Sequence, residues 1–461
     1  MAVDDPLNDL HYSDAPRVDT AIPGPRSQQL LERQAAHEGA TVAYPNAVPI
    51  ALESGKGATV RDLDGNTYID LFAGVGVLNV GHSNPYVLEG THEQLDDLVH
   101  TLDFPTEARL DLIEALDDIV PGGLQGENRI VFGGPTGSDA VETSIKLAKY
   151  NTGGDGLIAF RGAYHGASAG ALSLTAGRKY KRDYSPLLPN VTHVPYPYPF
   201  QQECSPETAA RRSIENLTEL LEDPYSGFTN PAGIWIEPIQ GEGGITVPPK
   251  GFLTEVQAIA NEHDIPLIVD EIQTGFGRTG EWFASDWDGV TPDVMPIAKA
   301  LGGIGLPLSA TVYHESLDTW GPGGHIGTYR GHVPAMVAGL RAIEFIRDHD
   351  LLAHARSVGK EMRQRILSAV DDLPGRVDVR GRGLFTGVEF LDSTGEPQTD
   401  LVNVVQRTCL ENGVIVWTAG RHGNVLRIIP PLVITHEQAE TSMNILAEAI
   451  RNHATAGPNQ L

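Results

Sequence analysis

Two stretches in the second half of the chain decide its fold, "IPLIVDEIQ" at residues 265–273 and "DVMPIAKALGG" at residues 293–303. Each begins with a short apolar run and ends in polar or glycine residues, a pattern typical of strands buried on both faces. The runs "NRIVFGG" (128–134), "GLIAFRG" (156–162) and "AGIWIEPIQ" (232–240) have the same form. Because helical patterns separate the five runs, the sequence predicts an α/β fold with a mostly parallel sheet covered on both faces.

The remaining segments predict a smaller second domain. Residues 1 to about 45 are polar and contain prolines, and we expect an arm with little structure of its own. "ATVRDLDGNTYIDLFAG" (58–74) predicts a β-hairpin around the turn pair Asp64-Gly65. After residue 335 a long amphipathic segment, short strands and a closing helix indicate a small α+β domain, completed by that hairpin. The predicted units are an arm and hairpin (1–84), a large domain (85–333) and a small domain (334–461).

Composition narrows the class of protein. The net charge of −27 argues against a nucleic-acid partner, because phosphate binding requires a basic surface. No apolar stretch approaches the roughly 18 residues that span a membrane, and the start lacks a secretory pattern, so we expect a cytoplasmic protein. The two cysteines, Cys204 and Cys409, match no zinc or redox spacing, and we expect no metal. Few lysines and many acids are typical of a protein adapted to high salt.

Lys299 is one of only eight lysines, against 25 arginines, and it lies between an apolar run and a glycine cluster. A lysine at a strand end can extend its ammonium group to solvent along an apolar surface. Apolar surroundings also lower the pKa of a lysine that must be neutral to react. This stretch alone leaves both interpretations open.

The residues after the predicted strands are the candidates for a site, because ligands bind outside the carboxyl ends of strands in an open parallel sheet. These residues are Asp270, Glu237, Lys299, the pair Tyr164-His165 and the loop "PTGSDA" (135–140). In that loop Gly137 and Ser138 precede a helix whose N-terminus could hold a phosphate, although an ordinary N-cap is the alternative. The loop lacks both the Walker A lysine and a G-x-G-x-x-G pattern, so we do not expect a nucleotide.

A phosphate cradle, an aromatic side chain, a buried carboxylate and a reactive lysine together match the needs of pyridoxal 5′-phosphate. This cofactor forms a Schiff base with a lysine, and its pyridine nitrogen requires a carboxylate partner. The sequence therefore predicts this cofactor, with Lys299 and Asp270 as the catalytic residues.

The motifs resemble those of the class III aminotransferases, which have the aspartate aminotransferase-like fold with a seven-stranded sheet in the large domain. The resemblance rests on "IVDEIQTGFGRTG" (268–280) and "PDVMPIAKALGGIGLPL" (292–308), with support in chain order from "GPTGSDAVETSIKLAK" (134–149), "FRGAYHG" (160–166), "IEPIQGEGG" (236–244) and "HIGTYRGHVPAMVAG" (325–339). It covers nearly the whole chain except the first 40 or so residues.

The resemblance implies a role for each cofactor-binding residue. Lys299 would hold the cofactor covalently and move the proton, and Asp270 would pair with the pyridine nitrogen. Gln273 would contact the ring hydroxyl, and Tyr164 would stack on the ring unless it simply packs in the core. The phosphate would be bound by Gly137 and Ser138, and by Thr328 of a neighbouring protomer.

The role of Thr328 makes the expected protein a homodimer with shared sites, in which dimers could pair into tetramers. A plain turn residue is the alternative for Thr328.

The resemblance also implies substrate contacts. Arg427, in "VLRIIPPL" (425–432), would bind the α-carboxylate of 2-oxoglutarate or glutamate. Glu242 would mask that arginine when a basic amino donor enters, and Glu237 would line the same pocket. The alternatives are an interdomain ion pair for Arg427 and a solvated loop carboxylate for Glu242.

The amino donor is indicated by a departure from the common family pattern. Ornithine, acetylornithine and many 4-aminobutyrate enzymes have arginine where "YHGASAG" (164–170) has Ala167. That stretch and "GLPLSATVYHESLDTWGPGGHIGTYRG" (305–331) resemble the diaminobutyrate–2-oxoglutarate aminotransferases. We expect terminal amino transfer between L-2,4-diaminobutyrate and 2-oxoglutarate. A 4-aminobutyrate or ornithine type enzyme, or a decarboxylase or aminomutase with the same cofactor, remains the alternative.

Overall fold

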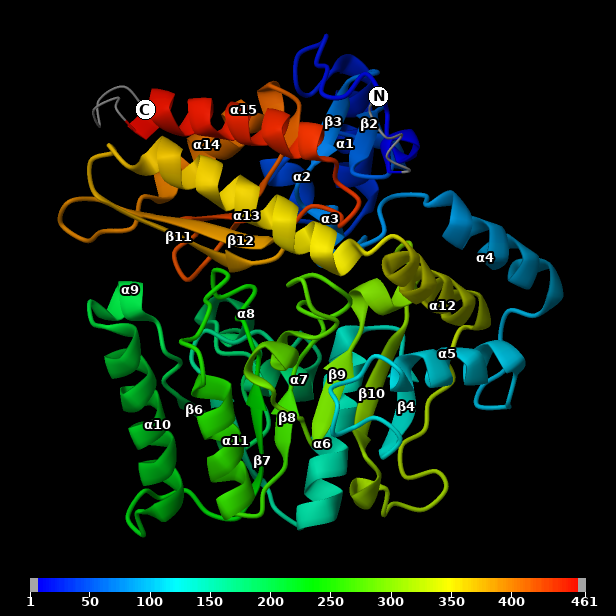
Figure 1. The fold of residues 1–461 in the computed structure, drawn as a ribbon, viewed down its shortest axis with the longest axis vertical. Coiled ribbons are helices and arrows are strands. Elements are labelled where there is room, and N and C mark those ends of the chain that lie inside the picture. The colour runs from blue at the N-terminus through cyan, green and yellow to red at the C-terminus, as the bar shows by residue number, and fades with distance from the viewer. Residues whose placement is uncertain (1–6, 455–461) are drawn as a thin grey trace.

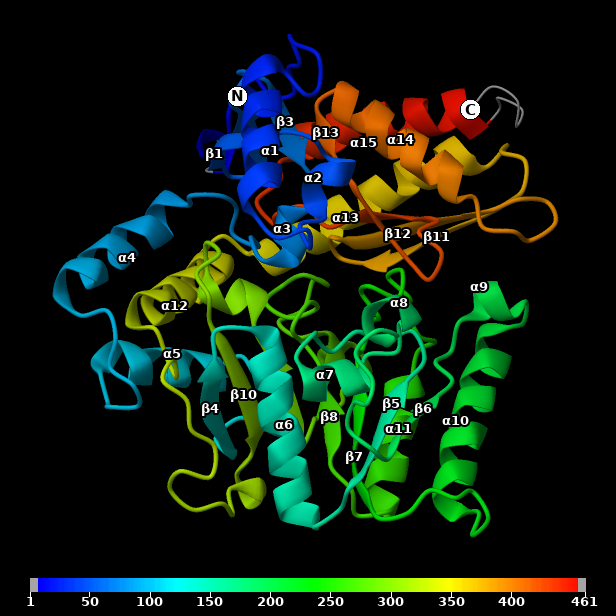
Figure 2. The same cartoon turned by 180° about the vertical axis from the view of Figure 1, so that it is seen from behind.

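The computed structural model describes residues 7–454, which form a lower and an upper part in Figure 1. The lower part is built around a seven-stranded sheet, and the upper part contains two four-stranded sheets with helices packed on them. The N-terminal segment and the last helices lie together in the upper part (Figures 1 and 2).

The seven-stranded sheet confirms the predicted α/β fold. Its strands pair in parallel except β10, the last of the seven along the chain and the second in spatial order, which runs antiparallel to both neighbours. In spatial order the strands are β4 (Asn128–Gly134), β10 (Ser309–His314), β9 (Val294–Ile297), β8 (Leu267–Val269), β7 (Pro231–Ile236), β5 (Gly156–Phe160) and β6 (Val191–Val194).

Helices cover both faces of this sheet, as the continuous apolar runs predict. Along β7, Ile234 and Ile236 pack into the cluster on one face, and Trp235 packs into the cluster on the other. Figures 1 and 2 show the two helical layers from opposite sides. One layer contains α10 (Pro206–Glu222) and α11 (Phe252–Glu262), and the other contains α6 (Gly137–Thr152) and α7 (Ala169–Leu174).

One of the two upper sheets, made of strands β11, β12, β15 and β14, is fully antiparallel and carries helices on its outer face (Figure 1). Its strands in spatial order are β11 (Arg376–Arg382), β12 (Phe385–Leu391), β15 (Val425–Ile428) and β14 (Trp417–Ala419). The helices of this part are α13 (Leu351–Val370), α14 (Thr399–Glu411) and α15 (His436–Ala454).

The second small sheet joins the N-terminal hairpin to the C-terminal part of the chain. The hairpin predicted around Asp64-Gly65 is confirmed, since its two strands pair antiparallel on either side of that turn. The adjacent strand comes from the C-terminal part and runs parallel, with Val414 opposite Ile69. The strands are β1 (Leu52–Lys56), β2 (Thr59–Asp62), β3 (Thr67–Asp70) and β13 (Val414–Ile415). We keep the division at residues 84 and 333 as a proposal.

The expectation of little structure in the N-terminal arm is wrong for α1 (Pro25–His37). Pro25 stands at its first position, where the missing N–H costs no hydrogen bond. The carboxylate of Asp64, in the hairpin turn, accepts hydrogen bonds from the N–H groups of Arg26 and Ser27 at 2.8 Å each. A residue far away in sequence thus caps this helix, which local patterns do not reveal.

The segment read as one long amphipathic stretch after residue 335 forms two helices, α12 (Val333–Asp348) and α13. Asp350 separates them in the left-handed conformation, with φ of +47°. Aspartate adopts this conformation more readily than most residues, so "DHD" can break a helical pattern that hydrophobic spacing alone would continue.

Other helices connect the sheets. They are α2 (Tyr44–Ala47), α3 (Ala73–Gly76), α4 (Pro85–Asp97), α5 (Glu107–Asp117), α8 (Arg178–Lys181) and α9 (Pro199–Gln202). Among residues 7–454, no helix combines the length and apolar character needed to cross a bilayer. The same residues contain no group of three or more His, Cys, Asp or Glu side chains placed to hold a metal ion.

Candidate active site

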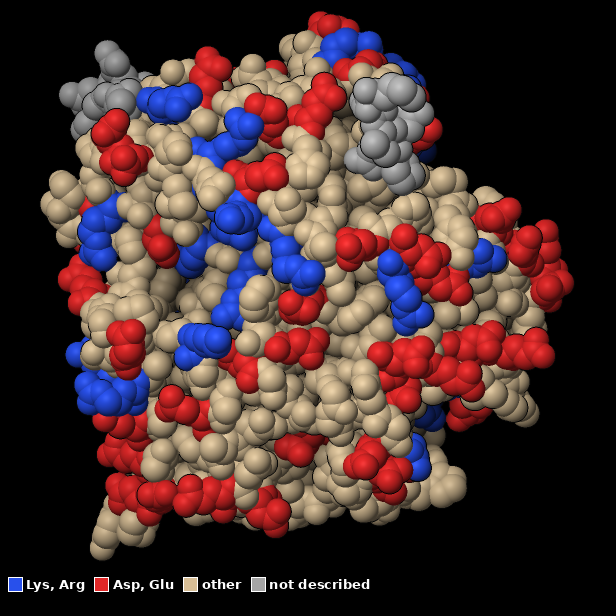
Figure 3. Space-filling model, viewed as in Figure 1, with Lys and Arg blue, Asp and Glu red and all other residues tan. Residues whose placement is uncertain are grey.

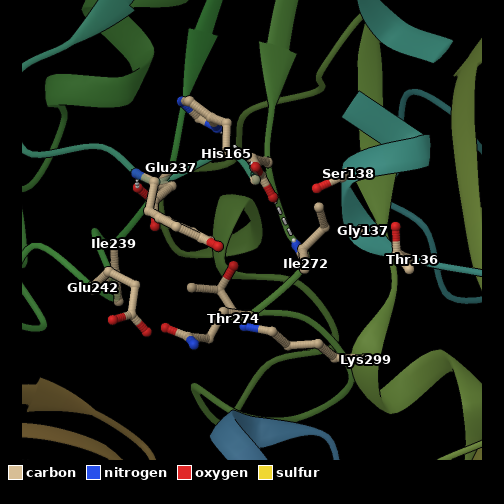
Figure 4. Close-up of a pocket in the computed structure, with 14 residues that line it drawn as sticks. Thr136, Gly137, Ser138, His165, Glu237, Ile239, Glu242, Ile272, Thr274 and Lys299 are labelled. Atoms are coloured by element: carbon tan, nitrogen blue, oxygen red, sulfur yellow. Dashed lines mark hydrogen bonds and ion pairs between the residues drawn. The ribbon is translucent and has the colours of Figure 1, made fainter. Parts of the chain in front are cut away.

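A cavity of about 180 Å³ lies at the carboxyl ends of the central strands and gathers most of the predicted site residues (Figure 4). Its walls come from the ends of β5, β7, β8 and β9 and from the start of α6. The predicted residues that line it are Gly137, Ser138, Tyr164, Glu237, Glu242, Asp270, Gln273 and Lys299. Strand ends distant in sequence therefore converge on one site, as expected for a parallel sheet.

Lys299 follows β9 at the start of a short 3-10 turn, Lys299–Gly302, and its own φ is +52°. Its side chain extends into the cavity (Figure 4). Burial lowers the pKa of Lys299 to about 8, although the carboxylate of Glu242 opposes this effect. A substantial fraction of neutral amine is therefore present near neutral pH, which a nucleophilic lysine requires.

Asp270 directly follows β8 and is held by a buried histidine. Its Oδ2 lies 2.8 Å from Nδ1 of His165, and its Oδ1 accepts a hydrogen bond from the N–H of Ile272 at 3.1 Å. Burial lowers the pKa of His165, but the hydrogen bond and charge of Asp270 outweigh this effect, so the net pKa is raised. The contact with His165 and the hydrogen bond from Ile272 fix the orientation of the Asp270 carboxylate.

The N-terminus of α6 forms one end of the cavity. The Asp139 carboxylate accepts hydrogen bonds from the N–H of Thr136 at 2.8 Å and from its hydroxyl at 2.7 Å. This interaction fixes the turn, so the N–H groups of Gly137 and Ser138 stand in the first helical turn without an intrahelical acceptor. A Cβ at Gly137 would lie 3.0 Å from Cδ1 of Ile272, so the close approach of backbone and cavity wall favours glycine.

Glu237 closes another side of the cavity and organises the loop that carries Tyr164. Its carboxylate accepts hydrogen bonds from the N–H of Tyr164 at 2.9 Å and from the N–H of Gly241 at 3.0 Å. The ring of Tyr164 packs edge-on against Tyr180, with centroids 5.1 Å apart. Burial raises the pKa of Glu237 to about 7.

Glu242 and Arg427 form an ion pair beside the cavity. Arg427 lies on β15, its side chain is almost wholly buried, and its Nη1 donates a hydrogen bond to Oε1 of Glu242. Its guanidinium lies over the ring of Phe72, 5.6 Å from the centroid. Burial raises the pKa of Glu242, but the charge and hydrogen bond of Arg427 outweigh burial, so the net pKa is lowered.

Comparison with known proteins decides the family. The family model described as aminotransferase class-III matches residues 41–450.

The chain belongs to the class III aminotransferases.

The names of this aminotransferase's relatives refer to different activities. It is 39% identical over 433 residues to a diaminobutyrate–2-oxoglutarate aminotransferase from Rhizobium meliloti (strain 1021), covering 91% of this chain and 92% of that protein. It is 33% identical over 449 residues to an alanine/serine racemase from Pyrococcus horikoshii, covering 95% and 94%. The structure of the ornithine aminotransferase from Toxoplasma gondii, described with partial occupancy of PLP, has a TM-score of 0.81 and 28% identity over 93% of this chain and 94% of that one.

Pyridoxal 5′-phosphate is the cofactor of this aminotransferase, as the sequence predicted. The cavity residues fit it. Oε1 of Gln273 is buried and has no hydrogen-bond partner among residues 7–454, so a ring hydroxyl would satisfy it. Lys299 supplies the amine, Asp270 the carboxylate, and the start of α6 an anion site.

His165 is the main residue of the site that the sequence analysis missed. It was noted only as the neighbour of Tyr164 at the end of β5. Its place at the end of a predicted strand was the only signal, because the strand order that puts β5 and β8 on either side of β7, and so the histidine near the buried acid, is seen only in the structure.

Two predicted site residues do not line the cavity: Arg427, which lies beside it and pairs with Glu242, and Thr328. Thr328 is exposed on the connection between β10 and α12. Its contact with the cofactor phosphate of a neighbouring protomer stays a prediction.

A pH dependence of stability follows from the burial of Glu237. Its pKa in the folded protein is about 7, against 4.5 for an ordinary glutamate, so the folded protein holds a proton that the unfolded chain releases. The stability that this bound proton contributes is therefore present below about pH 4.5 and is lost as the pH rises through about 7. As the pH rises through this range, the free energy of unfolding of the wild type should fall. In Glu237→Gln we expect this fall to be smaller than in the wild type, by on the order of 3 kcal/mol.

Urea unfolding of the cofactor-free protein at fixed salt measures this difference. The exposed Glu255→Gln serves as the control and should follow the wild type. A Glu237→Gln curve parallel to that of the wild type would contradict the prediction.

Proposed function

We propose that this aminotransferase exchanges the terminal amino group of L-2,4-diaminobutyrate with the oxo group of 2-oxoglutarate, giving aspartate 4-semialdehyde and glutamate, or runs the reverse reaction. The single observation that carries this proposal is the ion pair between Glu242 and Arg427 at the cavity. The name of the Rhizobium meliloti relative supports the same substrates.

The ion pair can serve two substrates that must enter one cavity in turn. With Glu242 on Arg427, the guanidinium charge is neutralised, and a diamine can present its terminal amine without meeting an unpaired cation. When 2-oxoglutarate enters, its α-carboxylate can replace Glu242 on Arg427 and form a comparable charge-assisted hydrogen bond. A two-step, ping-pong reaction needs such an exchange, whereas a one-substrate racemase or decarboxylase does not.

The bound cofactor supplies an electron-withdrawing ring and an aldehyde that takes up the amino group. The protein supplies the remaining functions. Lys299, with its lowered pKa, can accept and return a proton at the reacting carbon. Asp270, oriented by His165, would be the carboxylate partner of the pyridine nitrogen. Glu237 holds the loop of Tyr164 in place at the ring, and the start of α6 fixes the phosphate.

A panel of amino donors with 2-oxoglutarate tests the proposed substrates. It compares diaminobutyrate, ornithine, 4-aminobutyrate and acetylornithine, and adds L-alanine and L-serine without an acceptor to detect racemisation. We expect the highest kcat/KM for diaminobutyrate. A higher value for another donor, or racemisation faster than transfer, would contradict the proposal.

Arg427→Gln should separate the two half-reactions. It removes the partner of the α-carboxylate, and we expect kcat/KM for 2-oxoglutarate to fall by roughly 10²-fold. The diaminobutyrate half-reaction should fall far less, because that substrate has no carboxylate on its reacting carbon. Single-turnover spectra of each half-reaction measure both effects.

Glu242→Gln is the matched variant for Arg427→Gln. It leaves Arg427 unmasked, so we expect it to impair diaminobutyrate more than 2-oxoglutarate. Equal losses for both substrates in both variants would contradict the exchange of partners.

Adaptation to high salt remains part of the proposal. The net charge is −27, and in Figure 3 acidic side chains gather along the lower edge and over α4 and α5, whereas Lys and Arg gather near the middle of that face. Because salt screens the mutual repulsion of the acidic side chains, we expect the melting temperature to rise steeply with potassium chloride, by more than 10 degrees or so between dilute and molar salt. Equal melting temperatures at both concentrations would show that the acidic surface has another cause.

We further propose a cytoplasmic homodimer with shared active sites. The exposed position of Thr328 leaves it accessible to a second protomer. Thr328→Val should weaken cofactor retention in dimers, and sedimentation would establish whether dimers pair into tetramers.

A further inference from the structure

A second cavity, of about 500 Å³, adjoins the active site and shares two wall residues with it, Tyr164 and Glu242. It lies beside α8, which Figures 1 and 2 place between the seven-stranded sheet and the upper part. Four cations line it: Arg161, Arg178, Lys179 and Arg421. We call this space the cationic cavity.

The cationic cavity is unusual for this protein. The chain has 60 acidic side chains against 33 Lys and Arg. Of the carboxylates in the described part of the chain, Glu242 alone lines this cavity, and it is engaged by Arg427. Within residues 7–454 none of the four cations forms an ion pair. All four are exposed, and because they share one cavity without acidic partners, their charges favour an anion there.

The cationic cavity is connected to the active site through aromatic side chains. Nζ of Lys179 lies 4.8 Å from the centroid of the Tyr180 ring, which packs against Tyr164. Arg421 lies near Gly162, where an added Cβ would be 3.4 Å from its Nη2, and its guanidinium lies over the ring of Tyr198, 5.4 Å from the centroid. Burial raises the pKa of Glu242, Arg427 and then Lys299 lower it, and the charge of Lys179 lowers it to a smaller extent.

The two proposed substrates share one feature that a single anion site can recognise. In diaminobutyrate reacting at its terminal carbon, the carboxylate carbon lies three carbon–carbon bonds from the reacting carbon. In 2-oxoglutarate reacting at its oxo carbon, the distal carboxylate carbon lies at the same separation. One site can therefore bind both carboxylates, while Arg427 binds the carboxylate that 2-oxoglutarate alone carries on its reacting carbon.

We propose that Arg178, Lys179 and Arg421 form a common subsite for the distal carboxylate of both substrates. The inference rests on the proposed function. It assigns these residues as the ones that set the enzyme's preference for the chain length of the amino donor. Ornithine is one carbon longer than diaminobutyrate, and the subsite would disfavour it because its carboxylate would overshoot the cations.

Arg178→Gln/Lys179→Gln and Arg421→Gln test the subsite. We expect KM to rise about ten-fold for both diaminobutyrate and 2-oxoglutarate in each variant, with little change in kcat. Arg178→Lys/Lys179→Arg keeps both charges and should restore most of the affinity. Arg211→Gln/Arg212→Gln, on the exposed side of α10, removes the same charge far from the cavity and should leave both KM values unchanged.

Calorimetric binding of glutarate separates this inference from the proposed function. Glutarate carries both carboxylates of 2-oxoglutarate but cannot react, so its affinity reports the subsite even if diaminobutyrate is not the donor. Weaker glutarate binding in both cavity variants would support the subsite. Unchanged glutarate binding, or a KM increase for one substrate only, would overturn it.

Discussion

Lys299→Ala is expected to abolish amino transfer, with kcat lower by on the order of 10⁴-fold or more. The substitution removes both the amine that holds the cofactor and the base at the reacting carbon. The structure offers no substitute, because Lys299 is the only lysine among the residues that line the described cavity. Steady-state turnover and the visible absorbance of the lysine-bound cofactor should be lost together.

Lys250→Ala, which removes an exposed lysine, is the matched control and should leave both signals unchanged. Lys299→Arg retains a positive charge but cannot react with the aldehyde, so it should be as inactive as Lys299→Ala. A Lys299→Ala enzyme with normal turnover would contradict the assignment of Lys299 as the reactive amine.

Asp270→Asn is expected to give the second largest loss, roughly 10²- to 10³-fold in kcat. An amide cannot supply the negative charge that the pyridine nitrogen requires, and it removes the carboxylate that raises the pKa of His165. The loss should fall on kcat more than on KM for either substrate, because Asp270 lies at the cofactor end of the cavity. Single-turnover rates of both half-reactions measure it.

Glu271→Gln is a neighbouring control of similar chemistry. Glu271 is also buried, but it accepts hydrogen bonds from Thr274 and from the N–H of Ser285 at 2.8 Å, and it does not line the cavity. The Glu271→Gln enzyme should retain most of the wild-type turnover. If Asp270→Asn and Glu271→Gln were equally active, Asp270 would not be the partner of the cofactor.

The central sheet and the convergence of its strand ends could be predicted from the sequence because both depend on local patterns. A short apolar run such as "IPLIVDE" indicates a buried strand, and a parallel sheet places the residues after such runs on one edge. Asp270, Glu237 and Lys299 could therefore be assigned to one site before any geometry was known.

Contacts between distant segments could not be predicted in this way. The carboxylate of Asp64 caps a helix that precedes it by almost forty residues, and no local signal marks that pairing. The orientation of Asp270 by His165 depends on the order of strands in the sheet, which the sequence does not state. The break at Asp350 depends on one residue in a left-handed conformation.

The central claim is that Lys299 is the residue that holds the cofactor covalently. The most direct test is borohydride reduction of the purified holoenzyme, followed by proteolysis and mass spectrometry of the modified peptide. The account predicts a pyridoxyl group on Lys299 and on none of the other seven lysines. A pyridoxyl group on another lysine, or none on the protein, would contradict it.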